Sequence, residues 1–170
     1  MNLRRVELRD WKAYRHARFV FPPADGRRNI ILIGAPNGFG KTSFFEALTL
    51  GLFGREGLPL VPCATFQNGG DGDGKLQTSY NQFLREAIHK RAIADGRPSC
   101  SVELEFEDDD GETIVLKRCW HFSPNGSHKP GDEELLVFQG AAGRAVGPPA
   151  TVTIERRSAA RSHFLLRWTP

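Results

Sequence analysis

The stretch from residue 29 to Gly54 constrains the fold of this chain more than any other. Residues 29–33 (Asn-Ile-Ile-Leu-Ile) form a continuous apolar run, which predicts a strand buried on both faces. A glycine-rich segment follows at 34–43. An apolar segment from about Lys41 to Phe53 then predicts a buried helix, and Gly54 is a typical residue at which such a helix ends. The predicted order is therefore strand, loop, helix.

The loop has the residue types that a bound phosphate requires. Residues 35–42 match G-x-x-x-x-G-K-[ST] at every fixed position except the first, where Ala35 replaces glycine. Gly38 and Gly40 can take a positive φ, so several backbone N–H groups can converge on an anion at the start of the helix. Lys41 is predicted to contact the β- and γ-phosphates of a nucleotide, and Thr42 to ligate Mg²⁺. The simpler alternative is a glycine-rich turn before a core helix. The predicted nucleotide-binding residues of the loop are Ala35, Pro36, Asn37, Gly38, Phe39, Gly40, Lys41, Thr42 and Ser43.

The residue types in and after the loop indicate one particular group of phosphate-loop proteins. Residues 35–48 (Ala-Pro-Asn-Gly-Phe-Gly-Lys-Thr-Ser-Phe-Phe-Glu-Ala-Leu) resemble the G-P-N-G-x-G-K-[ST]-x-x-x-E-A-[IL] of the RecF, SbcC and SMC-type ATPases, which act in DNA repair and chromosome maintenance. Phe39 departs from the small residue usual there. Residues 3–14 resemble the opening segment of the same family, with Asp10 in place of the usual Asn. This resemblance implies that Lys12 lies near the nucleotide phosphates, with Arg9 close by; the alternative is that both are solvated charges on a strand edge.

A third segment resembles a smaller group within this family. Residues 79–89 (Ser-Tyr-Asn-Gln-Phe-Leu-Arg-Glu-Ala-Ile-His) resemble the segment that follows the phosphate loop in the DndD family, the SMC-like ATPases of bacterial DNA phosphorothioation, a sulfur modification. The resemblance implies an α/β P-loop NTPase fold, the N-terminal lobe of an ABC ATPase head, with a mixed sheet and an antiparallel β-hairpin region. It implies ATP and Mg²⁺ as cofactors. The implied partners are DNA, a C-terminal lobe or second ATPase head, and other DNA sulfur-modification proteins.

Local patterns predict the remaining elements. Leu3, Val6 and Leu8 suggest an edge strand, and residues 22–26 a hairpin loop between two strands. Residues 55–75, rich in Gly and Pro, suggest a surface excursion. Ser79 begins a capping box, and an apolar stripe predicts a helix that ends at residues 95–98.

Alternating residues on either side of an acidic turn predict a β-hairpin over residues 100–122. A three-residue loop that ends at Gly111 would pair Phe106 with Ile114 and Leu104 with Leu116. The same register sets Cys100 against Trp120, so no disulfide between Cys100 and Cys119 is implied. The run of aspartates at 108–110 is predicted to be a solvated turn rather than a metal site, and His89 a structural residue rather than a catalytic base.

Composition limits the class of protein. A chain of 170 residues with 39% hydrophobic residues is expected to form one compact domain. No apolar run approaches the roughly 18 residues of a membrane span, and three Cys without an export signal suggest a cytoplasmic protein with reduced thiols. The net charge is +3, and the N-terminal 28 residues are the most basic part, which suits a nucleotide or nucleic acid. An ordinary solvated surface explains the same charges equally well.

The end of the chain departs from the family pattern. We predict a lobe at residues 1–146 and an irregular tail at 147–170, the product of a truncation, a frameshift or a fragment. No Walker B Asp-Glu, signature L-S-G-G or heptad repeat is present, so hydrolysis is expected to need a C-terminal lobe absent here. Gln139 fits either the family's Q-loop glutamine or a hairpin turn. Two other readings stay open: a complete small P-loop enzyme, such as a kinase or GTPase, and a non-catalytic DNA-binding or assembly module that retains the fold.

Overall fold

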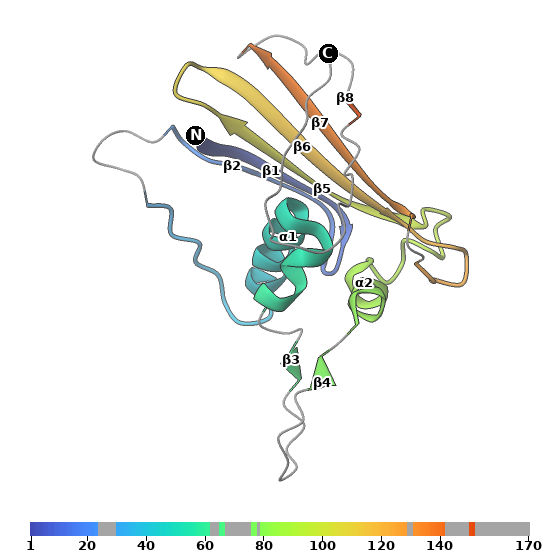
Figure 1. Ribbon diagram of the computed structural model, residues 1–170. Helices are drawn as coiled ribbons and strands as arrows, with labels where there is room; N and C mark the ends of the chain where they lie inside the picture. Colours follow the sequence, from blue (N-terminus) through green and yellow to red (C-terminus); the bar gives the residue numbers. More distant parts are fainter. Residues whose placement is uncertain are drawn as a thin grey trace.

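The computed structural model describes residues 1–23, 30–61, 79–128 and 131–141, together with three two-residue strands. The elements in chain order are β1 (Asn2–Trp11), β2 (Tyr14–Val20), α1 (Lys41–Phe53), the 3₁₀ helix η1 (Gly54–Leu60), β3 (Thr65–Phe66), β4 (Leu76–Gln77), α2 (Tyr80–Ala87), β5 (Ser99–Glu107), β6 (Glu112–His121), β7 (Glu133–Ala141) and β8 (Ala150–Thr151). Both α-helices lie on the same side of one twisted sheet, and β3 and β4 pair with each other beyond the helices (Figure 1).

The described strands of the main sheet follow the order β2-β1-β5-β6-β7-β8, and every neighbouring pair is antiparallel. The prediction of a mixed sheet is therefore wrong for the described residues. The prediction that β1 is an edge strand is also wrong, because β1 lies between β2 and β5. Its pattern of one apolar and one charged face is that of a strand whose sheet has a core on one side only, and this pattern does not distinguish an edge from an interior position.

The predicted hairpin of β5 and β6 is confirmed in its register. Phe106 lies opposite Ile114, Leu104 opposite Leu116, and Cys100 opposite Trp120. Cys100 and Cys119 are both free thiols. The turn is closed by the side chain of Asp108, which accepts hydrogen bonds from the backbone N–H of Asp110 and Glu112, and the described residues contain no cluster of acidic, His and Cys side chains that could hold a metal.

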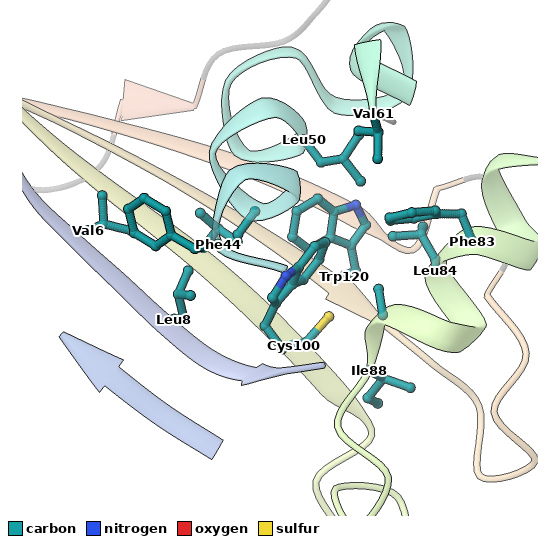
Figure 2. Packing of buried hydrophobic residues seen from close by; sticks show 14 of the residues in the cluster. Val6, Leu8, Phe44, Leu50, Val61, Phe83, Leu84, Ile88, Cys100 and Trp120 are labelled. Atoms are coloured by element: carbon teal, nitrogen blue, oxygen red, sulfur yellow. The ribbon is translucent and has the colours of Figure 1, made fainter. Parts of the chain in front are cut away.

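The core fills the space between the sheet and the two helices. Trp11 from β1 and Trp120 from β6 are fully buried, and their ring centroids lie 5.2 Å apart. Figure 2 shows Leu50 of α1 and Phe83 and Leu84 of α2 around Trp120, with Phe44 of α1 beside Val6 and Leu8 of β1. Because both helices contribute to one cluster, the start of α1 is fixed against the sheet rather than held only by its own hydrogen bonds.

The helix after the loop is confirmed from Lys41 to Phe53, and Gly54, with φ of 55°, ends it. Burial on all sides is not confirmed. Phe44, Ala47 and Leu50 are buried against the sheet, but the outward-facing members of the apolar set are exposed. These are Phe45, Leu52 and Phe53. A helix on one face of a sheet buries only the side turned toward it, so the side turned away remains open.

The N-terminus of the second helix is confirmed, because the hydroxyl of Ser79 accepts a hydrogen bond from the backbone N–H of Gln82. Its end is different from the prediction, since α2 stops at Ala87 rather than near residue 95. Ile88 is extended and forms an isolated antiparallel bridge with Trp11. Pairing with the end of β1 therefore competes successfully with continuation of the helix.

The largest departure concerns the predicted buried strand before the loop. Asn29 lies outside the described residues, and residues 30–36 have no regular secondary structure. Ile30 is 81% exposed and Leu32 is 92% exposed. The predicted hairpin with this segment as its second strand is likewise not formed within the described part; β2 pairs with β1 instead, through the turn at Lys12 and Ala13. A strand buried on both faces needs neighbouring strands and two covering layers, and no described strand pairs with this segment.

A buried polar network fixes the C-terminal end of α1. The guanidinium of Arg118 on β6 donates through Nε to the carbonyl of Gly51 at 3.1 Å and forms an ion pair with Glu133 at 2.5 Å. The hydroxyl of Tyr80 donates to the same carboxylate at 2.9 Å and accepts a hydrogen bond from the indole N–H of Trp120 at 2.8 Å. A cation is favourable at a helix C-terminus, so this network stabilises α1 at the end opposite the loop.

The other face of the sheet is charged. Arg5 on β1 contacts three carboxylates, at 2.8 Å to Glu103, 2.8 Å to Glu105 and 3.0 Å to Glu7. Glu7 also lies 3.1 Å from the imidazole of His16. These contacts explain why the alternating charged residues of β1 and β5 face away from the helices.

Three further predictions concern segments at or beyond the limits of the described residues. Gln139, which the sequence placed in a hairpin turn or a Q-loop, is an exposed residue within β7, paired with Ile114. In the predicted excursion at 55–75, residues 54–60 form η1 with Leu58 buried, while 62–64 and 67–75 lie outside the described residues. Of the predicted tail at 147–170, the structure describes β8 alone.

Candidate functional site

The glycine-rich loop is exposed and has the backbone conformation expected for anion binding. Gly38 has φ of 84° and Gly40 has φ of 85°, both in the left-handed region that residues with a Cβ rarely adopt. Gly40 is the residue that caps the N-terminus of α1, and its carbonyl accepts the first helical hydrogen bond, from Phe44 N–H at 2.9 Å. The first N–H groups of a helix have no intrahelical acceptor, so those at the start of α1 are directed toward the loop.

The side chain of Lys41 closes the loop on itself. Its ammonium donates to the carbonyl of Ala35 at 2.5 Å and to the carbonyl of Pro36 at 2.9 Å. Both contacts are at the exposed surface and cross from the first helical residue to the loop entry. A cation held by two carbonyls here is available to an incoming phosphate, because an anion offers it a stronger charge-assisted hydrogen bond than a neutral carbonyl does.

The remaining loop residues stand open to solvent. Asn37 and Gly38 form the turn, and Thr42 on the first turn of α1 is exposed. Phe39 is 68% exposed. The side chain of Ser43 is only partly exposed. The hydroxyl of Thr42 is thus accessible to a cation that arrives with a ligand.

The turn between β1 and β2 packs beside the loop and contacts it twice. The indole N–H of Trp11 donates to the carbonyl of Ser43 at 2.9 Å, and the hydroxyl of Tyr14 donates to the carbonyl of Gly40 at 3.1 Å. Both acceptors are main-chain groups at the junction of loop and helix. The first hairpin of the chain therefore fixes the position of the loop from outside.

Lys12 in the same turn is directed to α1. Its ammonium lies 2.5 Å from the carboxylate of Glu46, which is only 1% exposed, and 4.5 Å from the centre of the Phe83 ring. Glu46 follows Thr42 by four residues, so the two share one face of the helix. Arg9, by contrast, forms an ion pair with Glu7 at 2.6 Å and is not brought to the loop by any described contact.

The turn is itself held in an uncommon backbone conformation. Asp10 has φ of 48° and Lys12 has φ of 46°, which cost free energy in residues other than glycine. The neighbouring segment supports this conformation, because Lys12 N–H donates to the carbonyl of Ala87 and His89 N–H donates to the carbonyl of Asp10 at 2.7 Å. His89 thus acts through its backbone here, and its Nδ1 accepts from the N–H of Arg91.

Sequence reasoning did not assign a role at the loop to Trp11, Tyr14 or Glu46. The signal was present in the resemblance itself, since Trp11 and Tyr14 are positions of the opening motif and Glu46 is a position of the loop motif. Their contacts depend on how the hairpin crosses the helix, which no local pattern encodes.

The comparison with protein families shows the family of the chain. A family profile described as an AAA domain matches residues 5–158, most of the chain, including the loop and the hairpin that flanks it. The chain belongs to this AAA-domain family. Its members are AAA-type P-loop ATPases of the SMC/RecF-like superfamily, so the chain is a nucleotide-binding module of the ATPase type. A comparison with functionally curated proteins found no match.

The family match confirms the assignment to the P-loop ATPases of the SMC/RecF-like superfamily. The narrower assignment to the DndD family stays a prediction. The AAA-domain profile carries nothing specific to the DndD family. The match extends to residue 158, beyond residue 146, where we predict the lobe to end. The division of the chain at that residue stays a prediction. None of the helices within the described residues is long and apolar enough to cross a membrane.

Proposed function

We propose that this chain binds Mg-ATP at residues 34–43 as the N-terminal lobe of an SMC/RecF-like ATPase that acts on DNA in the cytoplasm, in DNA sulfur modification or repair. Hydrolysis in this proposal requires a C-terminal lobe or second ATPase head. The observation that carries the proposal is the loop geometry: two glycines with positive φ lead directly into the N-terminus of a helix whose first residue is a lysine.

The loop residues fit a triphosphate and its metal ion. A Cβ at position 38 would meet nothing within 4 Å, so the space in front of the turn is open. The N–H groups at the start of α1 and the ammonium of Lys41 would hold the β- and γ-phosphates, and the exposed hydroxyl of Thr42 would ligate Mg²⁺. The metal ion would neutralise charge on the phosphate oxygens. Ala35 replaces the first glycine of the motif, and its carbonyl is one of the two that Lys41 contacts.

Lys12 is part of this proposal as a second cation. It is paired with Glu46 on the face of α1 that also carries Thr42. Glu46 lies one helical turn from Thr42, so a triphosphate bound at the loop would compete with this carboxylate for the ammonium of Lys12.

The proposal separates binding from turnover. Glu46, the carboxylate that follows the loop most closely in the sequence, is buried and paired with Lys12, so it is not available to deprotonate water. Phosphoryl transfer to water needs a group that orients the attacking molecule. We therefore expect the chain alone to bind the nucleotide with negligible hydrolysis.

Equilibrium binding of ATP, with and without Mg²⁺, tests the proposal. Lys41→Ala should weaken binding by at least about tenfold, since it removes a charge-assisted contact of roughly 1.5–3 kcal/mol. Lys90→Ala removes an exposed lysine from the 90–96 turn and is the matched control. Equal affinity of the parent chain and Lys41→Ala for Mg-ATP would contradict the proposed site. Multiple turnover by the purified chain, abolished by Lys41→Ala, would contradict the separation of binding from hydrolysis.

A further inference from the structure

We propose that Tyr14 is a positioning residue of the phosphate loop: by holding the carbonyl of Gly40, its hydroxyl directs the N–H of Lys41 toward the phosphate group. This inference rests on the proposed function above. It assigns a role in ligand binding to the first hairpin of the chain, which lies outside the loop motif.

The peptide unit between Gly40 and Lys41 connects the two groups. The hydroxyl of Tyr14 lies 3.1 Å from Gly40 O and 3.5 Å from Phe39 O, so its single proton is donated to the nearer carbonyl. Gly40 O also accepts the N–H of Phe44 at 2.9 Å. A trans peptide is planar, with its C=O and N–H pointing in opposite directions. Two donors on the carbonyl of Gly40 therefore fix the direction of Lys41 N–H away from the helix and toward the loop.

The ring of Tyr14 fixes the same residue by contact. A Cβ at position 40 would lie 2.7 Å from the hydroxyl oxygen and 2.9 Å from the Cζ of Tyr14, so the aromatic side chain fills the space that only glycine leaves free. The positive φ of Gly40 and the close approach of Tyr14 are thus two requirements for glycine at one position.

The position of Tyr14 is determined by the core. Its ring lies edge-on to Phe19 of the same strand, with the centroids 6.0 Å apart, and Phe19 packs edge-on against Phe44 of α1 at 4.7 Å. Phe44 is buried. The hydroxyl therefore reaches Gly40 from a ring that is fixed to the helix it contacts, which limits the freedom of the loop relative to α1.

The hydroxyl is a donor throughout the neutral pH range. Burial raises the pKa of Tyr14 above its ordinary value of 10.0. The proton that bonds Gly40 O is consequently retained under the conditions in which ATP binding would be measured.

Two substitutions separate the hydroxyl from the ring. Tyr14→Phe keeps the ring and removes the hydrogen bond, and we expect it to weaken binding of Mg-ATP about three- to tenfold, the effect of one hydrogen bond. Thr49→Val is the matched control, because it removes another hydroxyl-to-carbonyl hydrogen bond of α1, from Thr49 to Phe45 O at 2.9 Å, away from the loop. The control should bind Mg-ATP as the parent does.

Inorganic tripolyphosphate with Mg²⁺ is the second probe. If Tyr14 acts through the N–H of Lys41, then Tyr14→Phe weakens tripolyphosphate and ATP by the same factor, since both place a phosphate at this amide. A loss with ATP alone would mean that Tyr14 contacts the nucleoside, and it would overturn the inference. Parental affinity in Tyr14→Phe would also overturn it, because a role in packing alone is rescued by phenylalanine.

The parent chain distinguishes this inference from the proposed function. Absence of ATP binding by the folded parent would mean that the proposed function itself fails, whatever the variants do. Binding by the parent, loss in Lys41→Ala and no change in Tyr14→Phe would leave the proposed function intact and reject only the role of Tyr14. Thermal unfolding of each ligand-free variant would show whether a lower affinity follows from loss of the fold.

Discussion

Replacement of Gly51 by alanine tests how closely α1 approaches the sheet, and thus what sets the position of the loop at the other end of the helix. A Cβ at Gly51 would lie 2.8 Å from Cγ1 of Val102 and 3.4 Å from Cδ1 of Leu104. Both neighbours are fully buried, and carbon atoms pack best at roughly 3.5–4.0 Å. The added methyl group therefore has to displace the helix or the strand.

Two opposing effects set the size of the result. Alanine stabilises a helix interior by about 1 kcal/mol relative to glycine. An extra methyl group in a packed core costs roughly 1–3 kcal/mol. We expect Gly51→Ala to lower the free energy of unfolding by about 1 kcal/mol, whereas a glycine that served only backbone flexibility would give a gain of that size. Denaturant-induced unfolding at 25 °C measures the difference.

A substitution of Val102 shows whether its close contact with position 51 causes the expected loss of stability. Val102→Ala should cost about 2–3 kcal/mol by itself, through lost burial and a cavity. In that background the Gly51→Ala methyl group has room, so it should stabilise the chain by about 1 kcal/mol, a coupling of roughly 2 kcal/mol between the two sites. The same gain in stability from Gly51→Ala in both backgrounds would refute the close approach, and with it the account of how α1 is seated.

The buried network and the charged face of the sheet give two further predictions. Arg118→Met should lower the free energy of unfolding by about 2–4 kcal/mol, because it leaves the carboxylate of Glu133 without this cation and removes a donor from the carbonyl of Gly51. The test is denaturant unfolding beside Arg118→Met/Glu133→Gln, and a double variant no more stable than the single one would contradict the pairing. Burial raises the pKa of Glu7, but hydrogen bonds from His16 and Arg9 outweigh burial and hold the pKa below 4.5. A carboxylate with a lowered pKa in the folded state stabilises that state above its unfolded pKa and loses this contribution as the pH falls through the folded value. Glu7→Gln should therefore lower the thermal midpoint at pH 7 and differ little from the parent well below pH 4.5. A difference in thermal midpoint that grows as the pH falls would contradict the lowered pKa of Glu7.

Several elements followed from the sequence because their causes are local. The acidic turn sets the register of β5 against β6, and one shift of the turn would move every side chain to the opposite face. Ser79 begins α2, since its hydroxyl satisfies the N–H of Gln82 within four residues. Gly38 and Gly40 have the positive φ that the loop pattern demands, and the helix after them ends at Gly54.

Elements that depend on distant partners were not predicted. The end of α2 is set by the bridge between Ile88 and Trp11, far apart in the chain. The interior position of β1 depends on β2 and β5, one of which follows it by nearly ninety residues. The apolar segment that begins at Ile30 has the composition of a buried strand and is exposed, because composition records what a segment can pack against and not whether a neighbour is present.

The candidate site likewise has a part that followed from the sequence and a part that only the tertiary structure showed. The sequence alone was enough to predict the loop and to propose its chemistry, because a run of ten residues contains the glycines, the lysine and the threonine at the start of the helix that presents them. Only the tertiary structure decided what holds that loop. It placed the hydroxyl of Tyr14 on Gly40, the indole of Trp11 on Ser43 and the ammonium of Lys12 on Glu46. Each of these contacts joins the first hairpin to α1 across more than twenty residues, and such pairings arise from the packing of one sheet against one helix rather than from any local preference of the chain.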